Sequence, residues 1–243
     1  MAKDPNQTTA SFLGLPRELR DHIYTYLLNE YHQPPEGPSQ AGPRSKTSAP
    51  IYFPLSSSKP ALLQLKLCSK QLHSEVTSTI TRHIDQLPGE AHLDIMIRNT
   101  NIYPTWTSLP LTRDLPQEIH IALRLFESTS WGGNEFSTSA YRSLWSLFWS
   151  LVFLGPCFQH NTRGLTTPLD IGCLKFTIRL CFPTTVEDLF GTYRDVFDRL
   201  ERLASDNVGL GHVGMVEARL GQDCRRWRLR KFETGLTFAS RVD

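Results

Sequence analysis

The strongest constraint on the fold is a strict alternation of hydrophobic and polar side chains in the middle of the chain. Every second residue of Glu118-Ile-His-Ile-Ala-Leu-Arg-Leu-Phe126 is aliphatic, from Ile119 to Leu125, and Leu174-Lys-Phe-Thr-Ile-Arg-Leu180 alternates in the same way. Successive side chains of a strand point to opposite faces, so each stretch predicts a β-strand with one buried face. Such strands need neighbouring strands and an apolar layer over one side.

The second half of the chain repeats these signals. Thr184 followed by Glu187 is a capping box that opens a helix over about 185–204, and an aromatic-rich helix is expected over 138–154. We therefore expect an α+β fold whose domain at residues 90–243 holds a mixed, mostly antiparallel sheet of about five strands, covered by two helices. The expected strands lie near 92–97, 118–126, 173–181, 213–220 and 226–232.

The first 85 residues are organised differently. Residues 1–11 form a polar tail that we expect to be flexible, and residues 12–85 form a helical segment. One helix begins at Pro16, and a second begins after Ser58, where Ser and Pro suit the cap and the first turn. An apolar stripe predicts the buried face of the second helix; it consists of Leu65, Cys68, Leu72, Val76 and Ile80. Between the helices, residues 31–58 are rich in Pro, Ser and Gly, so we expect a loop without regular structure apart from a short strand at 51–53.

Composition excludes some classes of protein. The 243 residues are 40% hydrophobic with a net charge of +2, which favours a packed core and gives no electrostatic reason to expect a nucleic-acid partner. Five widely spread cysteines and a polar N-terminus predict a reduced cytoplasmic or nuclear location. The apolar run 144–154 is too short to span a bilayer, so no membrane contact is expected and the run is read as a helix covered by protein.

Motifs for chemistry are weak. Gly209-Leu-Gly211-His-Val-Gly214 matches the dinucleotide fingerprint in letters, but a helix precedes it and a strand follows it, the reverse of what phosphate binding needs. Cys157 and His160 would be half a metal site without a second half, and His120 lies on the polar face of its strand, where it is solvated or paired. In the cluster Arg225–Arg230, Trp227 alternates with arginines, so in a strand the aromatic ring and the arginines point to opposite faces. This favours a solvated or salt-bridged strand over a nucleic-acid surface. We expect no enzyme activity, no catalytic residues, no cofactor and no metal.

One motif carries a family resemblance. Leu15-Pro-Arg-Glu-Leu-Arg-Asp-His-Ile-Tyr-Thr-Tyr-Leu27 resembles the first helix of the F-box, in the form found in fungal F-box-like proteins, and Leu62–Val76 resembles the next recognisable block of that group. The matching positions, and the partner-binding residues that the resemblance implies, are Leu15, Pro16, Glu18, Leu19, Ile23, Tyr26 and Leu27. The chain departs from the family in residues 29–59, which separate the two blocks, and in lacking the Trp of a later F-box helix.

The resemblance implies binding instead of catalysis. F-box helices dock their apolar face on a Skp-type linker protein, which joins them to a cullin ubiquitin ligase, and another part of the chain holds a target protein. An aliphatic stripe on a short helix suits such a helix-in-groove contact. The alternative is a structural or interaction module that joins no ligase, in which the helix at 15–27 packs only against the rest of the chain. The burial of Leu19 and Ile23 distinguishes these two hypotheses.

Overall fold

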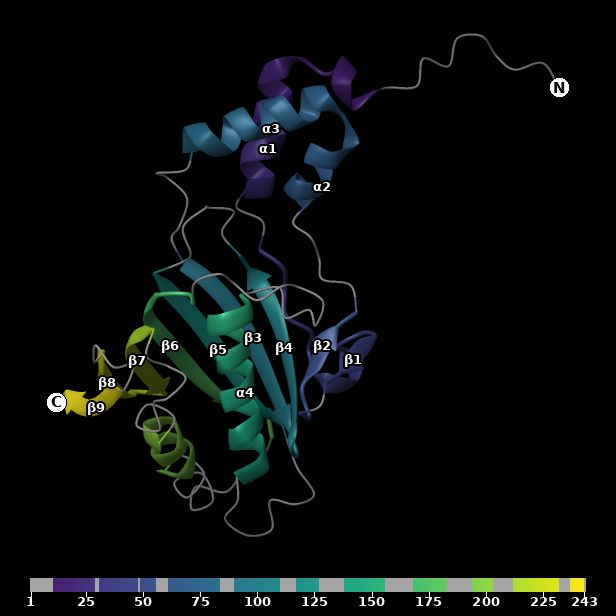
Figure 1. Cartoon of the computed structure of the whole chain (residues 1–243). Coiled ribbons are helices and arrows are strands. Elements are labelled where there is room, and N and C mark those ends of the chain that lie inside the picture. Colours follow the sequence, from purple (N-terminus) through teal and green to yellow (C-terminus); the bar gives the residue numbers. More distant parts are fainter. Residues whose placement is uncertain are drawn as a thin grey trace. The chain divides into compact units, whose positions relative to one another are not determined.

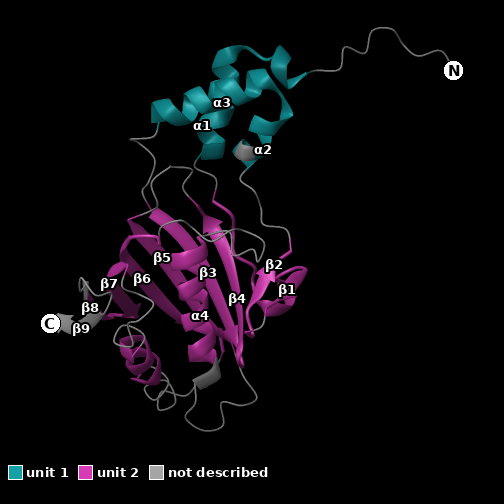
Figure 2. Ribbon diagram, viewed as in Figure 1, with its two compact units in different colours: residues 1–30, 58–87 teal, residues 31–57, 88–243 magenta. Residues whose placement is uncertain are grey.

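The computed structural model describes residues 11–28, 31–47, 49–55, 61–83, 90–109, 117–126, 138–155, 168–182, 194–202, 212–231 and 237–242. The chain divides into two compact units (Figure 2). Unit 1 comprises residues 1–30 and 58–87, and unit 2 comprises residues 31–57 and 88–243. The segment that separates the two F-box-like blocks in the sequence therefore belongs to unit 2, whereas the blocks themselves lie together in unit 1.

The described residues of unit 1 are helical, with a 3₁₀ turn η1 (Phe12–Gly14) and the α-helices α1 (Arg17–Leu28), α2 (Ala61–Cys68) and α3 (Lys70–His83) (Figure 1). The second predicted helix is broken at Ser69, whose Oγ accepts a hydrogen bond from the backbone N of Leu72 at 3.2 Å. This hydroxyl caps the new helix α3 and satisfies one of its first amides. Cys68, which was expected on the buried stripe, is the last residue of α2 and is exposed, whereas Leu72 and Val76 of α3 are buried.

Unit 2 is built on a seven-stranded sheet in the order β4-β3-β5-β6-β7-β8-β9. The strands are β3 (Glu90–Arg98), β4 (Asn101–Ser108), β5 (Glu118–Phe126), β6 (Ile171–Leu180), β7 (Val213–Leu220), β8 (Asp223–Lys231) and β9 (Thr237–Val242). The predicted α+β class and mixed sheet are confirmed, but the expected strand number and the mostly antiparallel pairing are wrong. The central strands β3, β5, β6 and β7 run parallel to one another, and β4, β8 and β9 pair antiparallel at the edges.

The parallel pairs have two origins: β5 runs parallel to β3 because the antiparallel strand β4 lies between them in the chain, and β6 runs parallel to β5 because a helix connects these two strands. Helix α4 (Thr138–Leu154) connects β5 to β6, and such a crossover returns the chain to the same end of the sheet, so that the next strand runs parallel. The five expected strands match β3 and β5 to β8. Strands β4 and β9 were not predicted, and in β4 the alternation is interrupted by Pro104, which has no N–H for a ladder and suits the edge position of this strand.

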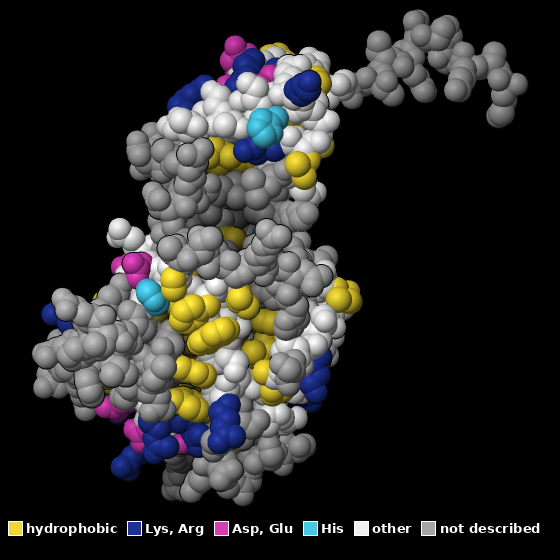
Figure 3. Space-filling view, in the orientation of Figure 1, with side chains coloured by type: hydrophobic (Ala, Val, Ile, Leu, Met, Phe, Trp, Pro, Cys, Tyr) yellow, Lys and Arg dark blue, Asp and Glu magenta, His cyan; other side chains and the backbone are white. Residues whose placement is uncertain are grey.

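The core lies between one face of the sheet and the helices. Side chains of α4 such as Leu144, Phe148 and Leu151 join those of β5 and β6 in one buried cluster, and so do Val196, Phe197 and Leu200 from the helical residues 194–202. The prediction that two helices cover one face is thus confirmed for the described residues; 183–193, with the capping box, lie outside them. Figure 3 shows hydrophobic side chains gathered on the α4 side of unit 2. In the part of the chain that is described, no helix combines the length and hydropathy needed to cross a membrane.

Residues 31–57 hold more structure than the sequence suggests. They contain a 3₁₀ turn η2 (Pro38–Gln40) and a two-stranded sheet of β1 (Arg44–Lys46) and β2 (Tyr52–Pro54). The expectation of a loop without regular structure is therefore wrong, although the short strand expected at 51–53 is found. Arg44 holds this segment on the main sheet, because its guanidinium donates to the carbonyl oxygens of Tyr52 in β2 and Pro104 in β4 at 3.0 and 2.8 Å. Buried Ile51 adds a parallel bridge to Ile102 of β4.

The second face of the sheet is polar. Its centre is a buried ion pair in which the guanidinium of Arg124 contacts both oxygens of Asp94, at 2.6 and 2.7 Å. The same guanidinium donates to the backbone oxygens of Pro35 and Glu36, so that residues 31–40 are fastened over this face. Burial raises the pKa of Asp94, and the bonds from Arg124 oppose that rise.

Candidate protein-interaction site

Helix α1 presents apolar side chains to solvent and turns Arg20 and Tyr24 toward helix α3. Leu19, Ile23 and Tyr26 are 51%, 36% and 79% exposed. Arg20 and Tyr24, which lie on the opposite side, are 6% and 0% exposed and pack on α3. The orientation is thus the reverse of an ordinary amphipathic helix, whose apolar stripe faces the core.

All of the partner-binding residues implied by the F-box resemblance lie on this surface. None of the seven is buried: Pro16, Glu18, Leu19, Ile23 and Tyr26 are exposed, and Leu15 and Leu27 are half-buried. The i, i+4 spacing of Leu19, Ile23 and Leu27 places them along one side of the helix, with Tyr26 beside them. Unit 1 therefore displays a contiguous apolar stripe, which we call the α1 stripe, consisting of Leu15, Leu19, Ile23, Tyr26 and Leu27.

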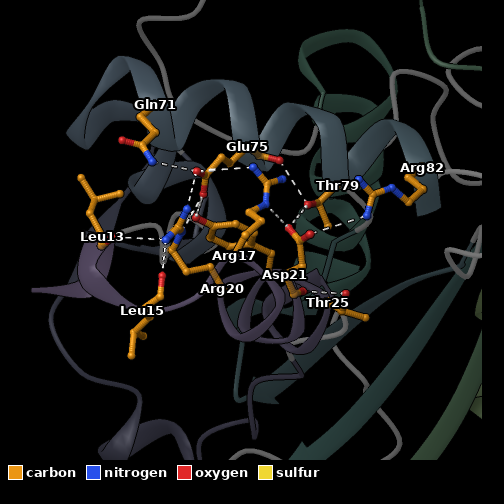
Figure 4. A network of polar contacts seen from close by, with 11 residues as sticks. Leu13, Leu15, Arg17, Arg20, Asp21, Thr25, Gln71, Glu75, Thr79 and Arg82 are labelled. Carbon is orange, nitrogen blue, oxygen red and sulfur yellow. Dashed lines mark hydrogen bonds and ion pairs between the residues drawn. The ribbon is translucent and has the colours of Figure 1, made fainter.

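The orientation of α1 is fixed by a buried carboxylate on α3 (Figure 4). Glu75 accepts two hydrogen bonds from the guanidinium of Arg20, from Nε at 2.9 Å and from Nη2 at 2.7 Å. The hydroxyl of Tyr24 donates to the same carboxylate at 2.9 Å, and Nε2 of Gln71 donates at 3.0 Å. Arg20 also donates to the backbone oxygens of Leu13 and Leu15, which ties the chain before α1 to the same point.

This network sets the ionisation of its members. The hydrogen bonds from Arg20, helped by those from Gln71 and Tyr24, lower the pKa of Glu75 to about 2. Burial raises the pKa of Tyr24 to about 12, and its bond to Glu75 adds to that rise. At neutral pH the centre of unit 1 is consequently a carboxylate and a guanidinium, joined by a neutral phenol. A buried charge of this kind is costly unless it is fully paired, so α1 can dock only with Arg20 over Glu75.

A second cluster continues the contact toward the end of α3. Asp21 accepts from Nε of Arg17 at 2.8 Å, and the hydroxyl of Thr79 lies 3.3 Å from the same oxygen. Nη1 of Arg82 lies 3.7 Å from the other oxygen of Asp21. Figure 4 shows the two clusters side by side along the α1–α3 contact. The side of α1 that carries Arg17, Arg20 and Asp21 is thus engaged over successive turns, which leaves the apolar stripe, with Glu18 and His22 beside it, exposed.

The sequence contains one indication of the buried Arg20–Glu75 contact, which a search for apolar periodicity overlooks. Glu75 lies three residues after Leu72 and beside Val76, at a position of α3 where an apolar residue is expected. A charged residue on the buried stripe of a helix requires a partner of opposite charge on the facing element. The Arg20–Tyr24 pair, spaced i, i+4, supplies both a cation and a hydroxyl, so a buried polar contact could have been inferred.

The glycine motif at 209–214 and the arginine cluster at 225–230 lie partly or wholly on strands β7 and β8. Gly214 is the second residue of β7, where a Cβ would lie 2.9 Å from the carbonyl oxygen of Gly172 in β6, so close strand packing explains this glycine. Trp227 is buried while Arg226 and Arg228 are exposed, and Nε of Arg226 bonds Glu217 at 2.8 Å, which confirms the salt-bridged strand expected there. The segments with Gly209, Gly211, Cys157 and His160 lie outside the described residues.

Neither protein-family models, nor curated proteins, nor solved structures give a match to the chain.

Proposed function

We propose that this chain is a non-catalytic adaptor of the F-box type, in which the α1 stripe docks into a groove of a Skp-type linker protein of a cullin ubiquitin ligase. The single observation that carries the proposal is the exposure of Leu19 and Ile23, since the described residues leave 51% and 36% of these aliphatic side chains open to solvent. An exposed stripe at helical spacing suits a partner that receives one face of a helix.

The organisation of the chain supports the same function. In the sequence, the long segment after α1 departs from a compact F-box, but residues 31–57 join unit 2, so that α1, α2 and α3 form one compact unit. The Arg20–Glu75 contact then fixes which side of α1 faces outward. Unit 2, with its own core, would hold the target protein.

The alternative function is a structural or interaction module that joins no ligase, with α1 packed only inside the chain. It predicts that the α1 stripe contributes to the stability of the chain, because burying a Leu or Ile side chain is worth about 1.5–3 kcal/mol. The adaptor predicts that the stripe contributes to binding instead. The exposure of Leu19 and Ile23 within unit 1 favours the adaptor.

The experiment measures binding of the full chain to a purified fungal Skp-type linker protein by calorimetry. We expect the wild type to bind, and Leu19→Asp with Ile23→Asp to lose more than ~100-fold in affinity, because each truncated hot spot costs about 2 kcal/mol or more. Ser74→Asp with Ser78→Asp is the matched control, since it adds the same charge to exposed positions of α3. The proposal fails if the wild type does not bind, or if both double variants bind equally.

Thermal unfolding of the same proteins separates the two functions. The adaptor predicts that Leu19→Asp with Ile23→Asp keeps the melting temperature close to that of the control. A large loss of stability, without any binding by the wild type, would instead support the structural module.

A further inference from the structure

The polar face of the sheet carries the same short sequence pattern at the start of two neighbouring strands. Strand β3 begins with Glu90-Ala-His92, and β5 begins with Glu118-Ile-His120. The two strands are parallel, and their register pairs Glu90 with Glu118 and His92 with His120. Because side chains alternate along a strand, all four side chains lie on one face, as two carboxylates beside two imidazoles.

The distances within this cluster are compatible with a metal site. Nε2 of His120 lies 3.4 Å from Oε2 of Glu90 and 3.7 Å from Oε2 of Glu118. One ligand atom from each of these three side chains lies within 4.8 Å of the other two. Ligands bound at ~2.0–2.2 Å around a tetrahedral ion are ~3.3–3.6 Å apart, so two of these contacts are already near that spacing. Nε2 of His92 lies 3.8 Å from Oε2 of Glu90 and is the next nitrogen donor.

His120 supplies an independent observation. Its Nε2 is shielded from solvent and lies at ion-pair distance from two carboxylate oxygens, but its geometry gives no well-formed hydrogen bond with a described residue. A shielded polar atom without a well-formed hydrogen bond costs free energy. A cation between Nε2 and the two oxygens would satisfy all three groups at once.

The imidazoles are held in place by ring contacts. The rings of His92 and His120 stack with centroids 4.9 Å apart, and the ring of Tyr31 meets His92 edge-on at 6.2 Å. Both imidazoles also line a pocket of about 200 Å³, whose wall includes Asp94 and Arg179. The ligands are therefore oriented, and an ion there would adjoin a polar hollow.

The ammonium group of Lys175 competes for the same site. Lys175 lies beside His120 in the β5–β6 register, and its Nζ contacts Oε2 of Glu118. Without an ion, this contact neutralises part of the negative charge of the two glutamates. A bound cation must displace the ammonium, which identifies Lys175 as a residue that weakens binding.

We propose that Glu90, Glu118 and His120, with His92 as a further nitrogen donor, bind a divalent transition-metal cation of the zinc type. A mixed set of imidazole and carboxylate ligands favours such ions over Mg²⁺ and Ca²⁺, which prefer oxygen alone. The site lies in unit 2 and does not depend on the proposed function of α1. No metal was expected from the sequence, because the two histidines lie in separate strands and no local pattern gives the pairing of those strands.

The test titrates the chelator-treated full chain with Zn²⁺ alone, in competition with a zinc-sensitive dye and in the presence of a phosphine reductant. We expect one ion to bind per chain, and His120→Ala or Glu118→Gln to weaken binding by more than ~10-fold. His22→Ala is the matched control, because it removes an exposed histidine of α1 and should leave the affinity unchanged. Lys175→Met should strengthen binding, a gain that misfolding cannot produce.

Co²⁺ provides a second readout of the ligands. Binding at this site should give visible absorption bands without the near-ultraviolet band of a cobalt–thiolate bond, which would appear if the exposed Cys68, Cys181 or Cys224 held the ion instead. Absence of Zn²⁺ binding, equal binding by the control and the ligand variants, or a thiolate band would each overturn the proposal. Mg²⁺ that binds as tightly as Zn²⁺ would overturn the assignment to a zinc-type ion.

Discussion

Replacing Glu75 by glutamine should destabilise unit 1 selectively. The glutamine side chain would keep the shape of the original and could still accept from the hydroxyl of Tyr24, but it would leave the guanidinium of Arg20 buried without a counter-ion. Removing one partner of a buried pair costs about 3–5 kcal/mol, and the retained hydrogen bond places this substitution near 3 kcal/mol. A unit of about 60 residues has a stability of only ~3–9 kcal/mol, so much of it would be lost.

The distribution of tryptophans makes this measurable. All five lie between residues 106 and 227 and therefore in unit 2, whereas unit 1 is helical. Denaturant unfolding should be followed by circular dichroism at the helical band and by tryptophan fluorescence on the same samples. We expect Glu75→Gln to shift an early loss of helical signal to lower denaturant and to leave the fluorescence transition in place.

Glu18→Gln is the matched control, because Glu18 lies on α1 but is exposed. It removes the same charge from the same unit and should change the stability by less than about 0.5 kcal/mol. The reasoning is refuted if Glu75→Gln costs no more than Glu18→Gln. It is also refuted if the tryptophan transition moves by the same amount as the helical one, since Glu75 would then not act on unit 1 alone.

Three further outcomes follow from the contacts described above. Because the folded pKa of Glu75 is about 2, below the ordinary 4.5, the contribution of its carboxylate to the stability of unit 1 is complete above pH 4.5 and is lost as the pH falls toward 2. The shift corresponds to ~3 kcal/mol, which solvent screening reduces to about 1–2 kcal/mol. Thermal melts followed at the helical band should therefore show a steeper loss of stability in acid for the wild type than for Glu75→Gln. Asp94→Asn should lower the stability of unit 2 by about 3 kcal/mol in fluorescence-monitored unfolding, because Arg124 stays buried without its counter-ion; an unchanged midpoint would contradict this. Gly214→Ala should destabilise unit 2 by about 2 kcal/mol or more, since its methyl group would press on the backbone of Gly172; Gly14→Ala, at an open position of unit 1, should leave unit 2 unaffected.

Local patterns predicted the elements of unit 2 well. In β5, the aliphatic side chains from Ile119 to Leu125 are buried, as their alternation required. The same pattern pointed to the wrong direction of pairing, because alternation is typical of antiparallel sheets with one polar face. Here the parallel strands alternate as well, since their second face carries polar groups such as the Arg124–Asp94 pair. The edge strand β4 escaped prediction for a different reason: it contains Pro104, and its register with β3 shifts between His92 and Leu93.

The periodicity of α1 identified its apolar stripe but not the direction in which the stripe faces. By the usual rule, a stripe from Leu15 to Leu27 would face the core. The orientation is decided by Glu75, which lies far along the chain and whose charge must be met by Arg20. Long-range electrostatic pairing of this kind has no periodic signature, so only the position of Glu75 on an otherwise apolar stripe indicates it.

Residues 31–57 belong to unit 2 although they lie between two parts of unit 1, and this affects how unit 1 can be produced as a separate fragment. The chain passes from one unit to the other at three places, after residues 30, 57 and 87. A fragment that ends at residue 87 would retain β1 and β2 but lose β4, and Ile51 would have no neighbour to bridge. During synthesis, likewise, α1 leaves the ribosome well before α3, the helix that carries its counter-charge. Excising unit 1 cleanly therefore requires a short linker in place of residues 31–57, not a single cut.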